Sequence, residues 1–150
     1  MAHQARFDED AVERLRIAIG KLGRSLRLRS TEGDLTPTQI SVLFTTVRCG
    51  PVSMAELAEL EGINPTLLSR AVGRLADAGL VERTPDPQDR RAASVQATAA
   101  GRRLRARTHR IRAVALRDEL DGLDGAQREA LQAALPALEA LAESLKGRRA

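Results

Sequence analysis

Cysteine and aromatic residues are scarce in this chain of 150 residues, which holds one cysteine, two phenylalanines and neither tryptophan nor tyrosine. A single cysteine, Cys49, excludes a disulfide within the chain and is typical of a reducing compartment. Proteins that bind single-stranded nucleic acids stack bases on aromatic side chains. The composition therefore argues against a protein that recognises single strands.

Long apolar runs are also missing, since none approaches the roughly 18 residues that a membrane span requires. The N-terminal sequence "MAHQARFDED" lacks the apolar segment of a secretory signal. These absences predict a cytoplasmic protein with no membrane partner. With 43% hydrophobic and 29% charged residues, the chain is expected to fold as one globular domain over residues 1–150.

Patterns typical of enzymes are missing as well. The two histidines, His3 and His109, accompany no metal-ligand or nucleophile motif, and His109 is expected at a solvated helix position. No glycine-rich phosphate loop occurs. We therefore expect no enzyme activity, no catalytic residues, no metal and no cofactor.

Basic charge is present and unevenly distributed. The formal net charge is +4, with nine arginines against three acidic residues over positions 80–112 and three basic against seven acidic residues over 113–146. A basic stripe of this kind attracts the phosphate backbone of nucleic acids. A solvated helix face produces the same pattern, so charge alone leaves both interpretations open.

Helix start and stop signals are frequent in the first half of the chain. Residues 7–30 have apolar residues three or four positions apart, which predicts a long amphipathic helix. Thr36, Pro37 and Gln39 have the order of a capping box with proline at the first helical position, and "CGP" at 49–51 ends the helix that follows. The buried face expected for this second helix consists of Ile40, Leu43, Phe44 and Val47.

Two short helices follow with almost no connection between them. Ser53 begins the first and Gly62 ends it, while Asn64 caps the second and Pro65 opens it. The turn "EGIN" is too short for antiparallel packing and favours a sharp crossing, as in a helix-turn-helix. The side of the second helix that we expect to be buried consists of Leu68, Ala71, Val72 and Leu75. Its opposite side carries Thr66, Ser69, Arg70 and Arg74.

That second side has the residue types that a helix in the major groove of DNA needs. Short polar side chains allow close approach to base edges, and arginine binds guanine or phosphate. An ordinary surface helix also carries these residue types. The segment that follows the helix therefore decides between a DNA-binding helix and an ordinary surface helix. "LVERT" and "AASVQA" predict two strands, and "RTPDPQDRR" between them predicts a charged tip that reaches the minor groove. The expected fold class is mainly α with a small β-wing, a winged helix-turn-helix over residues 36–100.

Most of the chain resembles the MarR (multiple antibiotic resistance regulator) family of transcription regulators. The resemblance rests on "LTPTQISVLFTTV", on "GLVER" followed by "DPQDRR", and on "TAAG". It implies about six helices, a homodimer formed through residues 1–30 and 101–146, and double-stranded DNA as partner. The DNA-binding residues that it implies are Pro65, Thr66, Ser69, Arg70 and Arg74 on or near the recognition helix, and Asp89, Arg90 and Arg91 in the wing.

The last predicted helix carries an apolar seam, which we define as Leu131, Leu135, Leu138, Ala142 and Leu145. The spacing of four, three, four and three places these residues on one helix face. Two interpretations remain open for this seam. It packs against a second copy of the chain, or it packs against the first helix of the same chain.

The function predicted from the sequence is a sequence-specific DNA-binding repressor that binds an inverted-repeat operator as a homodimer and is released by a small aromatic effector. The residues expected to border the effector are Phe44, Arg48 and Cys49. Two alternatives are a winged-helix module for protein interaction and a redox-responsive regulator using Cys49, although a buried inert thiol is favoured for Cys49. Glu56, Glu59 and Glu61 would repel phosphate and are expected to point outward.

Overall fold

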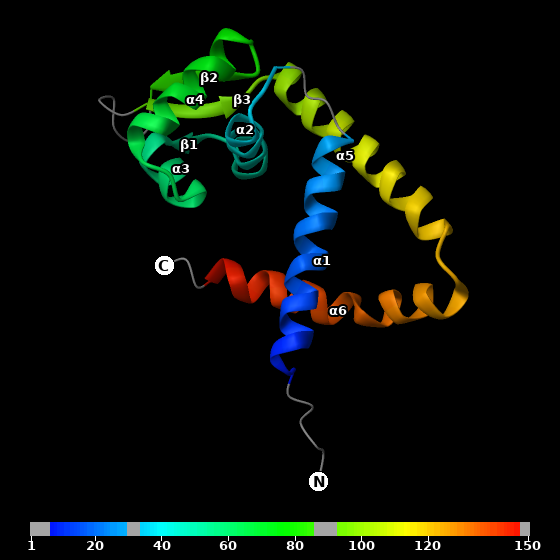
Figure 1. Ribbon diagram of the computed structural model, residues 1–150. Coiled ribbons are helices and arrows are strands. Elements are labelled where there is room, and N and C mark those ends of the chain that lie inside the picture. Colours follow the sequence, from blue (N-terminus) through cyan, green and yellow to red (C-terminus); the bar gives the residue numbers. More distant parts are fainter. Residues whose placement is uncertain (1–6, 30–33, 86–92, 148–150) are drawn as a thin grey trace.

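The computed structural model describes residues 7–29, 34–85 and 93–147. This part of the chain forms six helices and one three-stranded antiparallel sheet, which confirms the predicted mainly helical fold with a small β-wing (Figure 1). In chain order the elements are α1 (Glu9–Leu28), α2 (Pro37–Cys49), β1 (Val52–Ser53), α3 (Met54–Glu61), α4 (Pro65–Asp77), β2 (Val81–Pro85), β3 (Ala93–Ala97), α5 (Ala99–Asp121) and α6 (Gly125–Gly147). In the described ranges, no helix is long and apolar enough to cross a membrane.

The helix boundaries follow from local hydrogen bonds. The Thr36 hydroxyl accepts from the Gln39 backbone N–H at 3.3 Å, and the Gln39 side chain accepts from the Thr36 backbone N–H at 2.9 Å. Asn64 accepts from the backbone N–H of Leu67 at 2.9 Å. Gly62 ends α3 in the left-handed conformation at φ 63°. The predicted capping signals at these helix ends are therefore confirmed.

The sheet has the strand order β1-β3-β2, with both pairs antiparallel. β2 and β3 pair in the register Val81↔Ala97 to Pro85↔Ala93. β1 pairs Val52 with Val95 and was not predicted, because two residues are too short to show an alternating pattern.

The hydrophobic core lies inside the lobe formed by α2, α3, α4 and the sheet. The predicted buried side of α4 is confirmed, since its four apolar residues are at most 4% exposed. On α2, Leu43 is fully buried, whereas Ile40, Phe44 and Val47 are only half-buried. Val42, Thr45 and Thr46 of α2 are also buried. α2 contacts α3, α4 and α5, so its buried surface is wider than a single face.

Glu61 does not point fully outward, so that expectation was wrong. Its side chain is half-buried, and Oε1 accepts a hydrogen bond from Thr45 Oγ1 of α2 at 2.5 Å. The threonine hydroxyl stabilises a carboxylate at a place where burial without a partner would be costly. Glu56 and Glu59 are exposed, as expected.

The long helices extend away from the lobe. α5 leads from the sheet to a turn, and α6 runs back beneath the lobe (Figure 1). α1 contacts α5, and Arg29 at its end donates to Glu119 of α5 at 2.9 Å. Packing within the chain does not cover the seam of α6, because Leu131, Leu135 and Leu145 remain 42%, 51% and 59% exposed.

Candidate nucleic-acid interface

The core determines which side of α4 faces outward. Because Leu68, Ala71, Val72 and Leu75 point into the lobe, the opposite side is left at the surface. The predicted DNA-contacting residues of this helix are all exposed, namely Pro65, Thr66, Ser69, Arg70 and Arg74. We call Thr66, Ser69 and Arg70 the recognition face. They lie in the N-terminal half of α4, which is the part of a recognition helix that contacts base edges.

Leu67 adds an apolar group beside the recognition face. Its side chain is 42% exposed, next to the fully buried Leu68. Sequence reasoning missed Leu67, because it treated the exposed side of α4 as polar. An exposed apolar side chain at this position is suited to contact with the methyl group of thymine.

Arg74 has different surroundings from the recognition face. It lines a small cavity of about 400 Å³ near the C-terminal end of α4, where Asp34 and Asp77 also lie. Acidic neighbours make this arginine less attractive to phosphate than Arg70. The prediction that Arg74 contacts DNA has no further support from its surroundings.

The β2–β3 hairpin lies against α4 (Figure 1). The ladder of the hairpin ends at the pair Pro85↔Ala93. Asp89, Arg90 and Arg91, predicted for the tip of the wing, lie outside the described residues. Contacts between these three residues and DNA therefore remain a prediction.

Arg83 links the wing to the recognition helix. Its Nη2 donates to the backbone carbonyl of Ser69 at 3.3 Å, across from β2 to α4. On the neighbouring pair of the ladder, Gln96 donates to Glu82 at 2.5 Å. The Arg83 contact joins the hairpin to α4, and the Gln96–Glu82 contact joins the two strands of the hairpin. Sequence reasoning missed the role of Arg83, because a contact between residues fourteen positions apart has no local signal.

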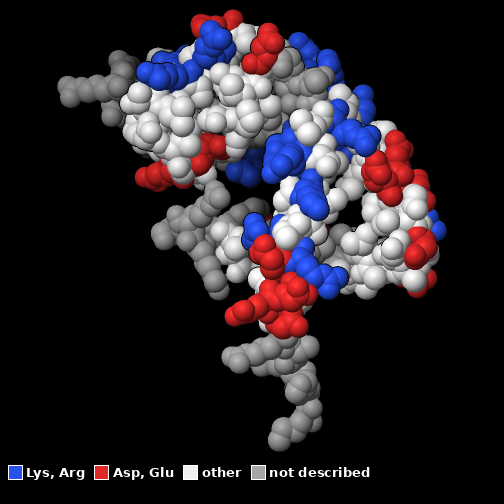
Figure 2. Space-filling model, in the orientation of Figure 1, with Lys and Arg blue, Asp and Glu red and all other residues white. Residues whose placement is uncertain are grey.

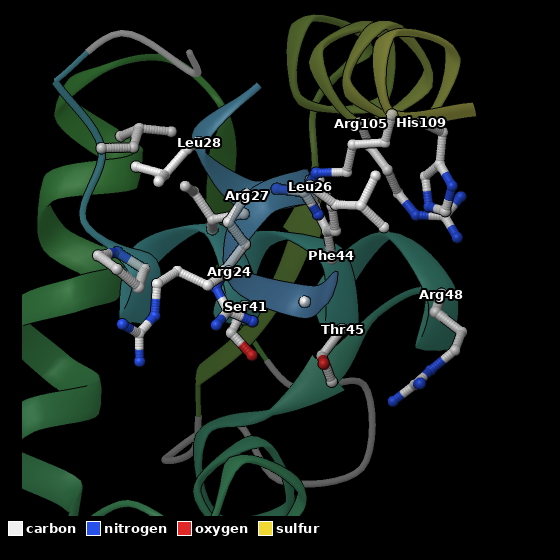
Figure 3. A pocket seen from close by; sticks show the side chains of 15 residues that line it. Arg24, Leu26, Arg27, Leu28, Ser41, Phe44, Thr45, Arg48, Arg105 and His109 are labelled. Atoms are coloured by element: carbon white, nitrogen blue, oxygen red, sulfur yellow. The ribbon is translucent and has the colours of Figure 1, made fainter. Parts of the chain in front are cut away.

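A cavity of about 1170 Å³ lies between α1, α2 and α5. Figure 2 shows Lys and Arg side chains gathered where α1 meets the lobe. We call the cavity between α1, α2 and α5 the basic cavity. Its lining residues are Gly23, Arg24, Leu26, Arg27, Leu28, Leu35, Pro37, Ile40, Ser41, Phe44, Thr45, Arg48, Arg105, His109 and Arg112 (Figure 3).

Phe44 lies among basic groups of α5. Its ring stacks with that of His109, with centroids 5.8 Å apart and an interplanar angle of 23°. The guanidinium carbons of Arg105 and Arg112 lie 6.0 and 5.7 Å from the ring centroid. His109 is solvent-exposed, as expected, but it also contacts an aromatic ring.

The three residues expected to border an effector have different positions. Phe44 and Arg48 line the basic cavity, but Cys49 is not among its lining residues. Cys49 is exposed at the end of α2, so the favoured interpretation as a buried thiol was wrong. The last turn of α2 lies at the rim of the core and leaves this side chain in solvent. The other basic lining residues were missed, because they come from helices far apart in the sequence.

Sequence comparisons relate the chain to transcription regulators. The sequence model described as "MarR family" matches residues 33–92. The chain is 31% identical over 139 residues to the uncharacterized HTH-type transcriptional regulator Mb0904 of Mycobacterium bovis, covering 91% of this chain and 97% of the relative. It is 33% identical over 88 residues to the multiple antibiotic resistance protein MarR of Salmonella typhimurium, covering 58% of this chain and 60% of that protein.

Solved structures have the same fold. The crystal structure of RV1404 from Mycobacterium tuberculosis superposes with a TM-score of 0.78 at 25% identity, covering 91% of this chain and 95% of that one. FabT of Streptococcus pneumoniae, solved in complex with DNA, superposes with a TM-score of 0.68 at 18% identity, covering 92% of this chain and 99% of that one.

Proposed function

The chain belongs to the MarR family of winged helix-turn-helix transcription regulators, and from this we propose that it is a homodimeric repressor that binds an inverted repeat in double-stranded DNA. The recognition face is the observation that carries the proposal. It combines two short polar side chains with an arginine, and the core behind it keeps all three at the surface. This arrangement is suited to direct contact with base edges in the major groove.

The exposed apolar surface of the long helices supports the dimer. On α1, Val12, Ile17, Ile19 and Leu22 are between 41% and 56% exposed, and the seam of α6 is exposed as well. Apolar surface on this scale is typical of an interaction site. A second copy of the chain, related by a twofold axis, would cover the exposed apolar residues of α1 and α6 with the same residues of its own α1 and α6.

A twofold dimer determines the form of the binding site. Two recognition helices related by a twofold axis contact two half-sites of opposite direction, about one helical turn apart. A dimer bound to such a site near a promoter would occupy the surface that the transcription machinery needs. Repression follows from this occupancy without any further contact. FabT, a protein of the same fold, was solved in complex with DNA, which supports DNA as the partner.

An effector in the basic cavity would reverse the repression. The cavity is lined by α1 and α5 on one side and by α2 on the other, and α2 packs directly against α4. A small ligand with an aromatic group, bound beside Phe44, would therefore change the position of the recognition helix relative to the long helices. The protein would release DNA if this ligand had a higher affinity for the conformation that does not fit the operator than for the conformation that does.

Selection of bound fragments from a random duplex library tests the proposed function. We expect the enriched sequences to contain an inverted repeat whose half-site centres lie about 10 to 10.5 base pairs apart. Affinity for this site should fall steeply with salt, with a slope of about −0.9 per phosphate contact. If no sequence is enriched and the affinity does not depend on salt, the alternative of a protein interaction module is favoured.

Replacing Arg70 should relax sequence preference at a single position. We expect Arg70→Ala to lose about 1 to 3 kcal/mol of discrimination at one base pair of each half-site, because a bidentate contact to guanine is removed. Repeating the selection with the variant measures the loss directly. Fluorescence anisotropy on duplexes that differ at this base pair measures the free energy.

Arg14→Ala is the matched control, since it removes the same charge from an exposed position on α1. Arg14 lies 3.7 Å from Asp10 and both side chains are about 80% exposed, so the pair contributes little to stability. The control should keep the sequence preference of the parent protein. An unchanged preference in Arg70→Ala would remove this arginine from direct base contact.

A further inference from the structure

Leu67 is an apolar residue at the edge of the recognition face. Its side chain is 42% exposed, whereas that of its neighbour Leu68 is fully buried. The core does not need Leu67, because the buried side of α4 consists of Leu68, Ala71, Val72 and Leu75. Single exposed leucines are ordinary on protein surfaces. What distinguishes Leu67 is its place in the first turn of α4, in the half of the helix that contacts base edges.

Helix geometry places Leu67 beside Arg70. Successive residues of an α-helix are about 100° apart around its axis, so Leu67 lies about 60° from Arg70 and about 160° from Ser69. The hairpin contacts α4 at Ser69, where Nη2 of Arg83 donates to the backbone carbonyl at 3.3 Å. Leu67 therefore borders the recognition face on the side away from this contact, next to the arginine.

The exposed side of α4 has little side-chain bulk around Arg70. Thr66 and Ser69 have short side chains, and Gly73 has none. A Cβ at Gly73 would meet no atom within 4 Å, so packing within the chain does not require glycine there. Such a surface allows the helix to approach base edges closely. Leu67 and Arg70 are the longest exposed side chains in this half of α4, so they reach farthest toward the bases.

One apolar group is available to a leucine in the major groove. Base pairs present hydrogen-bond donors and acceptors there, together with the 5-methyl group of thymine. A leucine placed against a donor or an acceptor would separate it from water without replacing its hydrogen bond, which is unfavourable. Contact with the methyl group instead removes apolar surface of both partners from water.

We propose that Leu67 contacts the 5-methyl group of a thymine in each half-site and makes this thymine part of the recognised sequence. Leu67 and Arg70 are about 4.5 Å apart along the helix axis, and base pairs are spaced by about 3.4 Å. The thymine should therefore lie within about two base pairs of the guanine that we expect Arg70 to contact. This inference rests on the proposed function, because it requires a DNA site that α4 contacts.

Replacement of thymidine by deoxyuridine removes only the 5-methyl group, so it tests the contact directly. Each thymine of the selected operator would be replaced in both half-sites at once, and the affinity of the full chain would be measured by fluorescence anisotropy. At one position near the guanine assigned to Arg70, binding should weaken about tenfold or more, since each lost methyl contact corresponds to a factor of about four. If no replacement within about two base pairs of this guanine weakens binding, the proposal is wrong.

Leu67→Ala completes a double-mutant cycle with the deoxyuridine duplex. The variant should bind the thymine duplex about tenfold more weakly than the parent protein and should no longer distinguish the two duplexes. Leu60→Ala is the matched control, because Leu60 of α3 is a leucine with a similar exposure of 45%. This control should distinguish the two duplexes as the parent protein does. Circular dichroism would verify that both variants are folded.

The possible results separate this inference from the proposed function. If an inverted repeat is selected but Leu67→Ala still distinguishes thymine from deoxyuridine, another residue contacts the methyl group and the role of Leu67 is overturned. The same conclusion follows if Leu67→Ala loses equal affinity for both duplexes. If the selection enriches no sequence, the proposed function fails and this inference fails with it. The deoxyuridine titration uses the unmodified chain, so its result does not depend on the folding of any variant.

Discussion

Gly101→Ala is expected to lower the free energy of unfolding by about 3 kcal/mol. A Cβ at Gly101 would lie 2.1 Å from the backbone carbonyl oxygen of Leu80 and 3.1 Å from a methyl carbon of Leu43. The same carbonyl accepts the Thr98 backbone N–H at 3.1 Å, which fixes the start of α5 against β2. The backbone at Gly101 and the carbonyl group of Leu80 cannot move apart without breaking this hydrogen bond. Urea unfolding followed by circular dichroism measures the loss.

Gly73→Ala is the matched control in the interior of another helix. A Cβ at Gly73 would meet no atom within 4 Å. Alanine has the higher helix propensity, so this variant should be more stable than the parent protein by up to about 1 kcal/mol. The two substitutions add the same methyl group and should have opposite signs. Equal stability of Gly101→Ala and the parent protein would show that the contact between α5 and the Leu80 carbonyl does not hold in solution.

Leu135→Glu is expected to convert the proposed dimer to a monomer and to weaken binding to the proposed operator at least about a hundredfold. The side chain of Leu135 is 51% exposed in the single chain, so the charge should not disturb the folded lobe. In a dimer, the glutamate would be buried in an apolar seam without a partner, which is strongly unfavourable. A monomer binds one half-site and loses the gain in affinity from linking two recognition helices. Sedimentation velocity and anisotropy titration measure the two effects.

Ala140→Glu adds the same charge to the same helix on the side opposite the seam. Ala140 is exposed and lies five positions after Leu135, about half a turn of the helix away. This control should remain dimeric and keep most of its DNA affinity, with a small loss from the added negative charge. If both variants remain dimeric, the seam does not form the subunit interface. If both become monomeric, the helix as a whole is sensitive to charge and the seam is not specifically involved.

The sequence predicted the recognition helix almost completely. Asn64 and Pro65 determine where α4 begins, because a cap and an N-terminal proline act through hydrogen bonds within the first turn. Once the start is known, helical periodicity places Leu68 and Leu75 inside and Ser69 and Arg70 outside. These are local rules, so they do not depend on the rest of the fold. The sequence alone is therefore enough to identify the recognition face.

The basic cavity could not be predicted in this way. Phe44 and Arg48 were expected at an effector site through the family resemblance, but Arg24, Arg105 and His109 were not. They come from α1 and α5, and no periodicity within either helix indicates which of its arginines will face α2. That choice depends on the angle at which three helices meet, which long-range packing sets. The exposure of Cys49 was also predicted incorrectly, because the last turn of α2 lies at the rim of the core.

The sequence by itself determined the order of the helices, their capped ends, the two strands of the wing and the side of α4 that faces outward. These features depend on hydrogen bonds and apolar spacing over only a few residues. Only the tertiary structure decided that Glu61 accepts a hydrogen bond from Thr45, that Arg83 contacts Ser69, and that arginines of three helices surround Phe44. Each of these contacts joins groups separated along the chain, and their positions follow from how the elements pack around the common core.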